Sequence, residues 1–281
     1  MAIGWVIDHP AHARLFAPLM REMSNPNDVI IACDRIEVRS MIEQSDGFLP
    51  RRKTVWVPRP VGKNRFRKAL TRYRISRKAL KNIELVISVG APIELRAAPK
   101  KSRRVYITDT EINHIAHKYS KPTDIVIPSH FEDKLSGNLL QKKAVIHRIS
   151  GLHGHAHLQP RMRPNQVSNP PKILMRKLLG DGIHDGGEIV EFPDAWLNGL
   201  NIINANENEY SAHPWKLDEE ISNCDGVITQ SVTLASEAAI LGVPALLISN
   251  AKRGFLTRLQ QDGYPIFISN EADESTYAAW L

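Results

Sequence analysis

Residues 225–248 decide the fold, and they read DGVITQSVTLASEAAILGVPALLI. An apolar run over 226–229 leads into a polar turn, a helix-forming stretch over 234–241 and a second apolar run over 245–248. Short, continuous apolar runs are typical of parallel strands that are covered on both faces. Strand, helix and strand in this order predict one unit of a doubly wound sheet.

The same alternation of strands and helices extends through the rest of the chain. In the first half, strands are expected at residues 3–8, 29–34, 54–57, 85–89, 104–108, 124–128 and 144–149, and helices at 12–23, 35–43, 63–81 and 111–118. Four prolines interrupt the pattern within residues 148–172, and it returns over residues 173–269. We therefore expect an α/β protein of two Rossmann-like, doubly wound domains facing a cleft. Their expected bounds are residues 1–150 and 151–281, with the linker at about residues 150–172.

Ser231 and Thr233 stand where the helix within residues 225–248 is expected to begin. Free backbone N–H groups and the positive end of the helix dipole make such a position a ready phosphate site. Glu237 follows about one turn later, where its carboxylate could accept two hydrogen bonds from a ribose diol. Either hydroxyl residue could instead simply cap the helix. A capping box does not account for Glu237, because its acid stands three residues after the cap. We favour a nucleotide site.

A second polar segment, DHPAHARLF at residues 8–16, directly follows the first expected strand. Ligands of open α/β sheets bind outside the carboxyl ends of the strands. Asp8 and His12 are therefore candidates for a general base, and Arg14 is a candidate for stabilising a leaving diphosphate. The alternative is that these side chains cap the following helix or lie on the surface, and the residues leave both interpretations open.

Other segments carry weaker signals. Asp109 follows a strand and could contact a substrate, but Thr108 and Glu111 have the spacing of a capping box, which is the more ordinary interpretation. The glycine-rich segment 180–187 adds Gly180 and His184 as candidate substrate contacts, although it could equally form a tight turn.

No cofactor or metal is expected from the sequence. Three alternating histidines, at positions 153, 155 and 157, lie in the expected linker without a supporting carboxylate, so we predict no metal site there. No G-x-G-x-x-G follows the first strand, and no phosphate-binding loop with Gly-Lys-Ser/Thr is present. Dehydrogenase and ATPase functions lose their main support, and any nucleotide would be part of a substrate.

The positive charge of the chain is concentrated in one segment. The net charge is +7, yet residues 51–81 hold 13 Lys and Arg and no acidic residue, against 24 basic and 30 acidic side chains elsewhere. Within the helix expected at 63–81, Phe66, Leu70 and Tyr73 form an apolar stripe flanked by basic residues. This pattern predicts a helix lying on an anionic membrane surface, or else a solvated helix whose stripe packs on the sheet. Nucleic acid is a less favoured partner, because only two aromatic rings could stack on bases.

Length and composition bound the protein class. The 281 residues are 42% hydrophobic and 24% charged, as in globular proteins. Cys33 and Cys224 lie far apart and match no metal or redox spacing, which favours the reducing cytoplasm. The longest apolar run, over 238–248, is shorter than the ~20 residues of a membrane span. We expect a cytoplasmic protein, peripheral to the inner face of the membrane.

Five motifs occur in the same order in a little-characterised prokaryotic family, which this chain resembles. They are the opening DHPAH at residues 8–12, SVGAP at 88–92, DTE at 109–111, HDGG at 184–187 and the block 231–244. That family is similar to UDP-N-acetylglucosamine 2-epimerases and GT-B glycosyltransferases. In the epimerases, the matching block binds the diphosphate through a serine and two glycines and the ribose through a glutamate. The resemblance therefore implies that Ser231, Val232, Thr233 and Glu237 occupy these places, with Val232 and Thr233 replacing the glycines.

The resemblance implies a nucleotide-sugar glycosyltransferase of cell-surface polysaccharide or glycolipid synthesis. The donor would bind the second domain and the acceptor the first. The nearest alternative is an epimerase, in which Asp109, Glu111 and His184 would supply acid and base groups. A different class of function is a non-catalytic protein that binds anionic lipid or nucleic acid through its basic segment.

Overall fold

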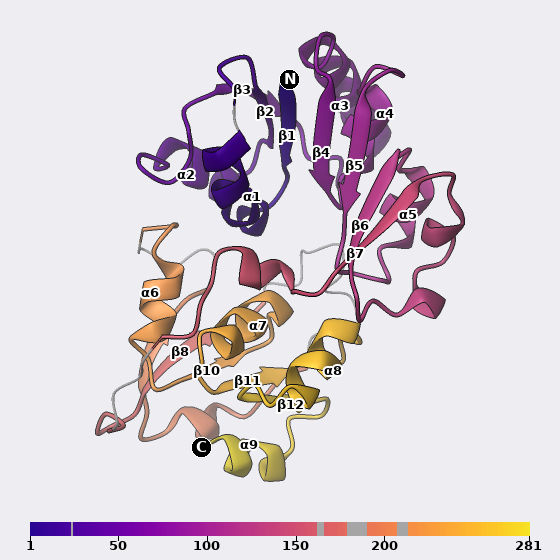
Figure 1. Cartoon of the computed structure of the whole chain (residues 1–281). Coiled ribbons are helices and arrows are strands. Elements are labelled where there is room, and N and C mark those ends of the chain that lie inside the picture. The colour runs from indigo at the N-terminus through magenta and orange to yellow at the C-terminus, as the bar shows by residue number, and fades with distance from the viewer. Residues whose placement is uncertain (24, 162–165, 179–189, 207–212) are drawn as a thin grey trace. The chain divides into compact units, whose positions relative to one another are not determined.

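The computed structural model describes the chain except residues 24, 162–165, 179–189 and 207–212 (Figure 1). The chain divides into two compact units, Met1–His157 and Leu158–Leu281. Each unit is built on a parallel sheet with helices between its strands, which confirms the predicted pair of doubly wound α/β sheets.

The first unit holds a seven-stranded sheet with the order β3-β2-β1-β4-β5-β6-β7. Its strands are β1 (Ile3–Ile7), β2 (Val29–Cys33), β3 (Lys53–Val57), β4 (Leu85–Val89), β5 (Arg103–Ile107), β6 (Asp124–Pro128) and β7 (Val145–Ile149). Its α-helices are α1 (Pro10–Met23), α2 (Ile36–Glu43), α3 (Arg65–Ala79), α4 (Pro92–Ala97) and α5 (His114–Tyr119), and the short helix η3 (His153–Ala156) follows β7. The turns η1 (Asp133–Leu135) and η2 (Leu139–Gln141) connect β6 to β7.

The centre of this sheet is fixed by burial on both faces. Every residue of β1, β2 and β4 is buried, as continuous apolar strands of a parallel sheet should be. Asp28 is buried beside them and is satisfied by the backbone N–H of Ile3 at 2.8 Å and the indole N–H of Trp5 at 3.0 Å. The Trp5 ring meets Phe16 of α1 edge to face at 5.4 Å, which holds that helix on the sheet.

The second unit holds a five-stranded sheet with the order β12-β11-β10-β8-β9. Its strands are β8 (Lys172–Arg176), β9 (Asn201–Asn204), β10 (Gly226–Thr229), β11 (Ala245–Ile248) and β12 (Ile266–Ser269). Its helices are α6 (Leu217–Ser222), α7 (Val232–Ile240), α8 (Gly254–Gln261) and α9 (Glu274–Trp280), with the short helix η4 (Asp194–Leu197).

Two glycines explain why residues 225–248 form their β-α-β unit. Gly242 ends α7 with φ +84, a left-handed conformation that glycine adopts without strain, and the chain then enters β11. At Gly226, an added Cβ would lie 2.9 Å from the Trp280 ring of α9. The missing side chain therefore lets Trp280 approach β10, while the final helix packs on β11 and β12. The indole N–H of Trp280 also donates to the Pro244 carbonyl at 3.1 Å.

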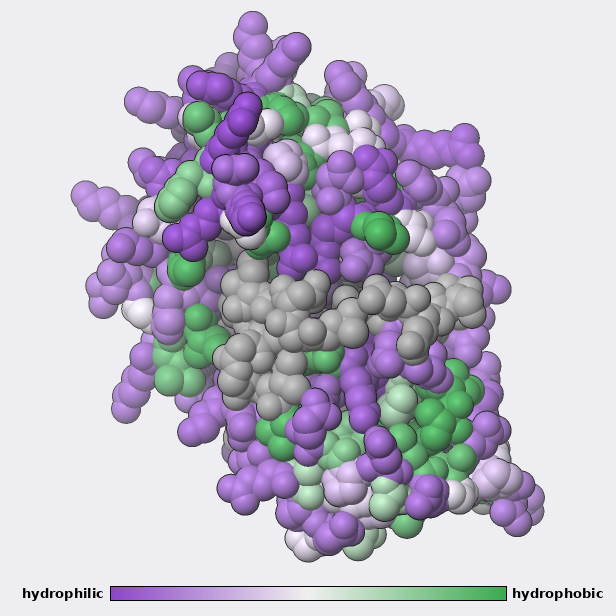
Figure 2. Space-filling view, turned by 180° about the vertical axis from the view of Figure 1, so that it is seen from behind, coloured by the Kyte–Doolittle hydropathy of each residue, from purple (hydrophilic) through white to green (hydrophobic). Residues whose placement is uncertain are grey.

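No helix in the described part of the chain combines the length and the apolar character needed to cross a membrane. In the view of Figure 2, hydrophilic residues cover most of the surface of the first unit, with apolar residues in small separate groups. The first unit therefore presents no broad apolar face in that view.

Candidate functional site

The order of the first sheet reverses at β1, which pairs with β2 on one side and with β4 on the other. In open α/β sheets, such a reversal opens a crevice outside the carboxyl ends of the strands, and ligands bind there. Asp8 follows β1 directly, Asp109 lies just beyond β5, and His153 lies beyond β7. The topology thus assembles ionisable side chains along the carboxyl edge of the sheet.

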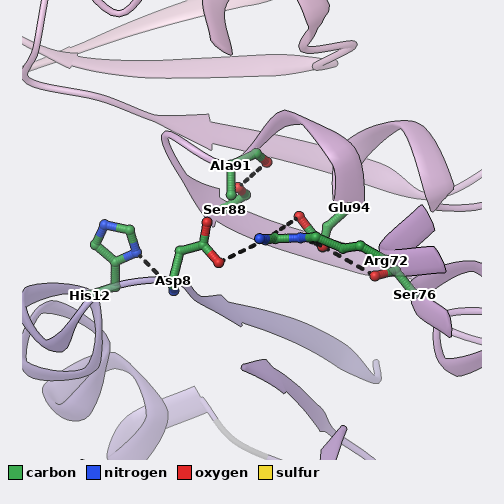
Figure 3. A network of polar contacts seen from close by, with 7 residues as sticks. All are labelled: Asp8, His12, Arg72, Ser76, Ser88, Ala91 and Glu94. Atoms are coloured by element: carbon green, nitrogen blue, oxygen red, sulfur yellow. Dashed lines mark hydrogen bonds and ion pairs between the residues drawn. The ribbon is translucent and has the colours of Figure 1, made fainter. Parts of the chain in front are cut away.

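An ion-pair network lies beneath this edge, and it joins β1 to two helices (Figure 3). The Arg72 guanidinium donates to Asp8 Oδ1 at 2.7 Å and to both carboxylate oxygens of Glu94, at 2.7 and 3.0 Å. Ser76 Oγ donates to the same Glu94 carboxylate at 3.1 Å. The Arg72 side chain is 2% exposed and that of Glu94 is 0% exposed. One buried cation therefore holds two carboxylates, and only Asp8 retains partial contact with solvent.

The network sets the charge state of Asp8. Burial alone would raise the pKa of this carboxyl, but the charge and hydrogen bond of Arg72 outweigh burial and lower it. Burial in turn opposes the charge on Arg72, while Asp8 and Glu94 outweigh it and raise the pKa of the guanidinium. Asp8 is therefore a stable anion at neutral pH, which makes it a weak general base and a good group for orienting a polar substrate.

The motif SVGAP at residues 88–92 builds this network. Ser88 Oγ donates to the Ala91 carbonyl at 2.6 Å, Gly90 takes a left-handed conformation with φ +59, and Pro92 opens α4. The tight turn places the first turn of α4 next to α3, so that Glu94 reaches Arg72. The motif therefore has a structural role that its sequence did not reveal.

His12 lies in the first turn of α1 and faces the loop that carries Asp8 (Figure 3). The backbone N–H of Asp8 donates to His12 Nδ1 at 3.2 Å, which favours the tautomer with its proton on Nε2. Burial lowers the pKa of His12 to about 4, although the charges of Asp8 and Asp109 oppose this change. His12 is thus neutral at pH 7, and its geometry suits a hydrogen-bond donor better than the general base predicted from the sequence. Arg14 lies partly buried on the same helix, and its role stays a prediction.

Asp109 pairs with His153, a residue that the sequence analysis assigned to the linker. The distance from His153 Nδ1 to Asp109 Oδ2 is 2.9 Å, and both side chains are mostly buried. Burial would raise the pKa of Asp109, but His153 and the Thr110 hydroxyl outweigh burial and lower it to about 2. Burial lowers the pKa of His153, but the charge and hydrogen bond of Asp109 outweigh burial, so that this pKa is raised. The one feature of the sequence that could have indicated this pair was a histidine shortly after an expected strand.

The predicted capping box around Asp109 is wrong. The helix begins at His114 rather than Glu111, and Asn113 caps it by accepting from the Ala116 N–H at 3.4 Å. Thr108 Oγ1 instead accepts from the Thr110 N–H at 3.2 Å, and buried Glu111 accepts from the Glu132 N–H at 3.2 Å. Thr108 and Glu111 therefore form hydrogen bonds that hold the loop carrying Asp109, and they do not cap a helix.

The sheet of the second unit reverses its order at β8, which pairs with β9 on one side and on the other with β10. Ser231 follows this strand and caps α7, accepting from the Leu234 N–H at 3.4 Å. Thr233 is exposed in the first turn, and Glu237, further along α7, is 5% exposed. Ser231 therefore caps α7. The first turn of this helix lies directly after the carboxyl end of β10. Gly180 and His184 lie outside the described residues.

Gln230 is a polar residue at this strand end that the sequence analysis did not select. Its side chain is buried, accepts from the Leu178 N–H at 2.8 Å and donates to the Val190 carbonyl at 2.9 Å. Gln230 thus ties the chain after β8 to the end of β10, immediately before Ser231. An amide residue directly after the apolar run 226–229 was the only signal available in the sequence.

No protein-family model matches the sequence, and no curated protein is similar to it. The fold is similar to solved structures. UDP-GlcNAc 2-epimerase from Methanocaldococcus jannaschii has a TM-score of 0.62 at 12% identity, over 100% of this chain and 91% of that chain. The S. aureus MnaA-UDP structure has a TM-score of 0.62 at 10% identity, over 99% and 86%. Arabidopsis thaliana UGT89C1 complexed with UDP-L-rhamnose has a TM-score of 0.60 at 10% identity, over 99% and 89%. These likenesses establish a GT-B type of fold along the whole chain.

Proposed function

We propose that this protein is a nucleotide-sugar-dependent glycosyltransferase that acts in cell-surface polysaccharide or glycolipid synthesis. The observation that carries the proposal is the start of α7 after β10, beside the strand at which the second sheet reverses its order. Helix N-termini at such points bind phosphate groups. Solved proteins of the same fold include complexes with UDP and with UDP-L-rhamnose, which supports a nucleotide sugar as the donor.

In this proposal the donor binds the second unit at Ser231, Thr233 and Glu237. The first unit receives the acceptor at Asp8 and His12. The Nε2–H of His12 would donate to an acceptor or sugar oxygen, and Asp8 would accept from a hydroxyl. Arg14 would stabilise the negative charge that develops on the leaving diphosphate.

An epimerase is a second candidate, and one observation favours it. Glu111 is buried in the same loop as Asp109, which places a second carboxylate in the first unit for acid and base chemistry. UDP-GlcNAc given without an acceptor separates the two activities. An epimerase converts it to the 2-epimer, in which the sugar is still joined to the diphosphate, whereas a transferase consumes it only when a hydroxyl group or water takes the sugar and the diphosphate is released.

A thermal-unfolding screen against UDP-, GDP-, CMP- and dTDP-sugars tests the proposal most directly. A nucleotide sugar present at 100 times its dissociation constant should raise the free energy of unfolding by about 2.7 kcal/mol. Stabilisation by one class of nucleotide and its sugars identifies the base. No shift with any of the four classes would contradict the proposal.

The role of Ser231 can be divided into capping and phosphate binding. Aspartate caps helices as well as serine does, so Ser231→Asp should change the free energy of unfolding by less than about 0.5 kcal/mol. Its carboxylate would repel a phosphate group at the start of α7, and UDP affinity should fall more than tenfold in calorimetric titration. The control is Ser231→Ala, which should lose about 1 kcal/mol of stability and much less affinity. If Ser231→Asp binds UDP as tightly as the wild type, the phosphate site lies elsewhere.

We also propose that α3 holds the enzyme on an anionic membrane. Phe66 is 78% exposed and Leu70 is 48% exposed, and exposed basic residues surround them. The third member of the predicted stripe, Tyr73, packs against the core instead, and Arg72 is buried. Each basic residue near anionic lipid contributes about 1 kcal/mol, so several together with two apolar anchors can retain a protein at the surface. The same helix carries Arg72 to Asp8, so membrane binding would keep the acceptor side next to lipid-linked substrates.

The double variant Phe66→Glu/Leu70→Glu should lose most of its recovery with vesicles that contain anionic lipid, by more than tenfold in flotation. The change places two carboxylates among the basic side chains and removes both apolar anchors. Ile115→Glu is a matched control, because Ile115 is 72% exposed on α5, outside the basic segment. Equal recovery of the wild type with and without anionic lipid would refute membrane binding, and retention on RNA but not on vesicles would point to nucleic acid.

A further inference from the structure

The pair formed by Asp109 and His153 lies at the carboxyl edge of the first sheet, within the first unit. Asp109 follows β5, whereas His153 begins η3 beyond the edge strand β7. The short helix η3 packs against α1, so the chain returns from the edge of the sheet to the helix that follows β1. This path carries His153 to Asp109 and into the electrostatic environment of His12.

The hydrogen bond fixes which nitrogen of His153 is available. A carboxylate at 2.9 Å from Nδ1 accepts a hydrogen bond from the N–H at that position, so the lone pair of the neutral ring is on Nε2. Within the described parts of the chain, the buried Nε2 atom has no hydrogen-bond partner. A buried polar atom left without a partner is costly, and a catalytic or ligand-binding role is one reason for which native proteins retain such atoms. A substrate hydroxyl would supply the missing partner.

We propose that His153, oriented by Asp109, is the general base that takes the proton from the acceptor hydroxyl; this inference rests on the proposed glycosyltransferase function. The acceptor oxygen forms a bond to the anomeric carbon of the donor sugar. The bond from that carbon to the diphosphate oxygen breaks, and its electron pair stays on the diphosphate. The hydroxyl proton moves to Nε2, and the resulting imidazolium is stabilised by the Asp109 carboxylate.

The neighbouring ionisable groups are less suited to this role. Asp8 is held as a stable anion by Arg72, and His12 uses Nδ1 to accept a backbone hydrogen bond. Burial lowers the pKa of His12 to about 4. In His153 the effect of Asp109 is larger than that of burial, and the pKa is raised. A base is most effective when its pKa lies near the working pH, which favours His153.

The test compares His153→Gln and Asp109→Asn with the wild type, using release of UDP from UDP-GlcNAc. Loss of a general base typically lowers the rate by about 10²–10⁴-fold, so His153→Gln should lose that much kcat. UDP affinity, measured by calorimetry, should stay within about threefold because the base does not hold the nucleotide. His147→Gln is the matched control, since it removes another His–Asp pair from the same sheet, that of the exposed His147 with the buried Asp124.

The pH profile of kcat/KM separates a base from a structural residue. In the wild type, activity should fall as the pH drops through the pKa of His153, because protonation occupies Nε2. In Asp109→Asn this acid limb should move to lower pH, since the carboxylate that raises the pKa is gone. Unchanged kcat in His153→Gln, or an acid limb that Asp109→Asn does not move, would overturn the role of His153. A folded wild type that neither binds nor consumes any UDP-, GDP-, CMP- or dTDP-sugar would instead overturn the proposed function on which that role rests.

Discussion

Arg72→Met is expected to lower the free energy of unfolding by about 3–5 kcal/mol, a large part of the stability of a typical domain. The guanidinium is almost fully buried and is the shared partner of Asp8 and Glu94. Methionine fills a similar volume but leaves the fully buried Glu94 carboxylate with only the Ser76 hydroxyl among the partners described above. Removing one partner of a buried pair is costly because the other charge stays desolvated. Urea denaturation at pH 7 measures the loss.

Two further variants test whether the buried charge is the cause. Arg74→Met removes an exposed arginine from the same helix and should change stability by less than about 0.5 kcal/mol. Adding Glu94→Gln to Arg72→Met removes the stranded charge and should restore part of the loss. If Arg72→Met costs less than about 1 kcal/mol, the carboxylates have other means of compensation and the network is not a stability element.

The fold was accessible from the sequence because it depends on patterns that are local. Continuous apolar runs predicted strands covered on both faces, and β1, β2 and β4 are buried along their whole length. The start of α7 was also local, since a hydroxyl residue after a strand fits the cap that Ser231 forms. Each of these strands and the cap of α7 could be predicted from a stretch of four to nine consecutive residues.

The ion pairs of the first unit join residues that lie far apart in the chain, and these pairs were not predicted from the sequence. Arg72 appeared as one of 13 basic residues in a segment expected to face a membrane or solvent, but its partners Asp8 and Glu94 lie 64 and 22 positions away. His153 was assigned to the proline-rich linker, and its partner Asp109 lies two strands earlier in the chain. Pairing of this kind follows from topology, which brings the carboxyl ends of parallel strands to one edge, and not from spacing.

Glu237→Gln is expected to weaken the binding of UDP roughly tenfold to a hundredfold. In the proposed donor site, the carboxylate accepts hydrogen bonds from the ribose hydroxyls while the start of α7 holds the diphosphate. Glutamine keeps the shape, removes the charge and replaces one acceptor by a donor, and a hydrogen bond to a charged group contributes about 1.5–3 kcal/mol. Calorimetric titration of UDP and GDP into both proteins measures the effect.

The burial of Glu237 makes stability part of this test. A carboxylate that faces a ligand in a cleft contributes little to folding, but the Glu237 side chain is only 5% exposed on α7. Thermal unfolding without nucleotide must therefore accompany the titration. Glu219→Gln is the control, because it removes the same charge from an exposed position on α6 of the same unit. A folded Glu237→Gln protein with unchanged UDP affinity would place the ribose elsewhere. A variant that unfolds on its own would make Glu237 a structural residue, and Ser231→Asp would then be the variant that decides whether α7 binds the diphosphate.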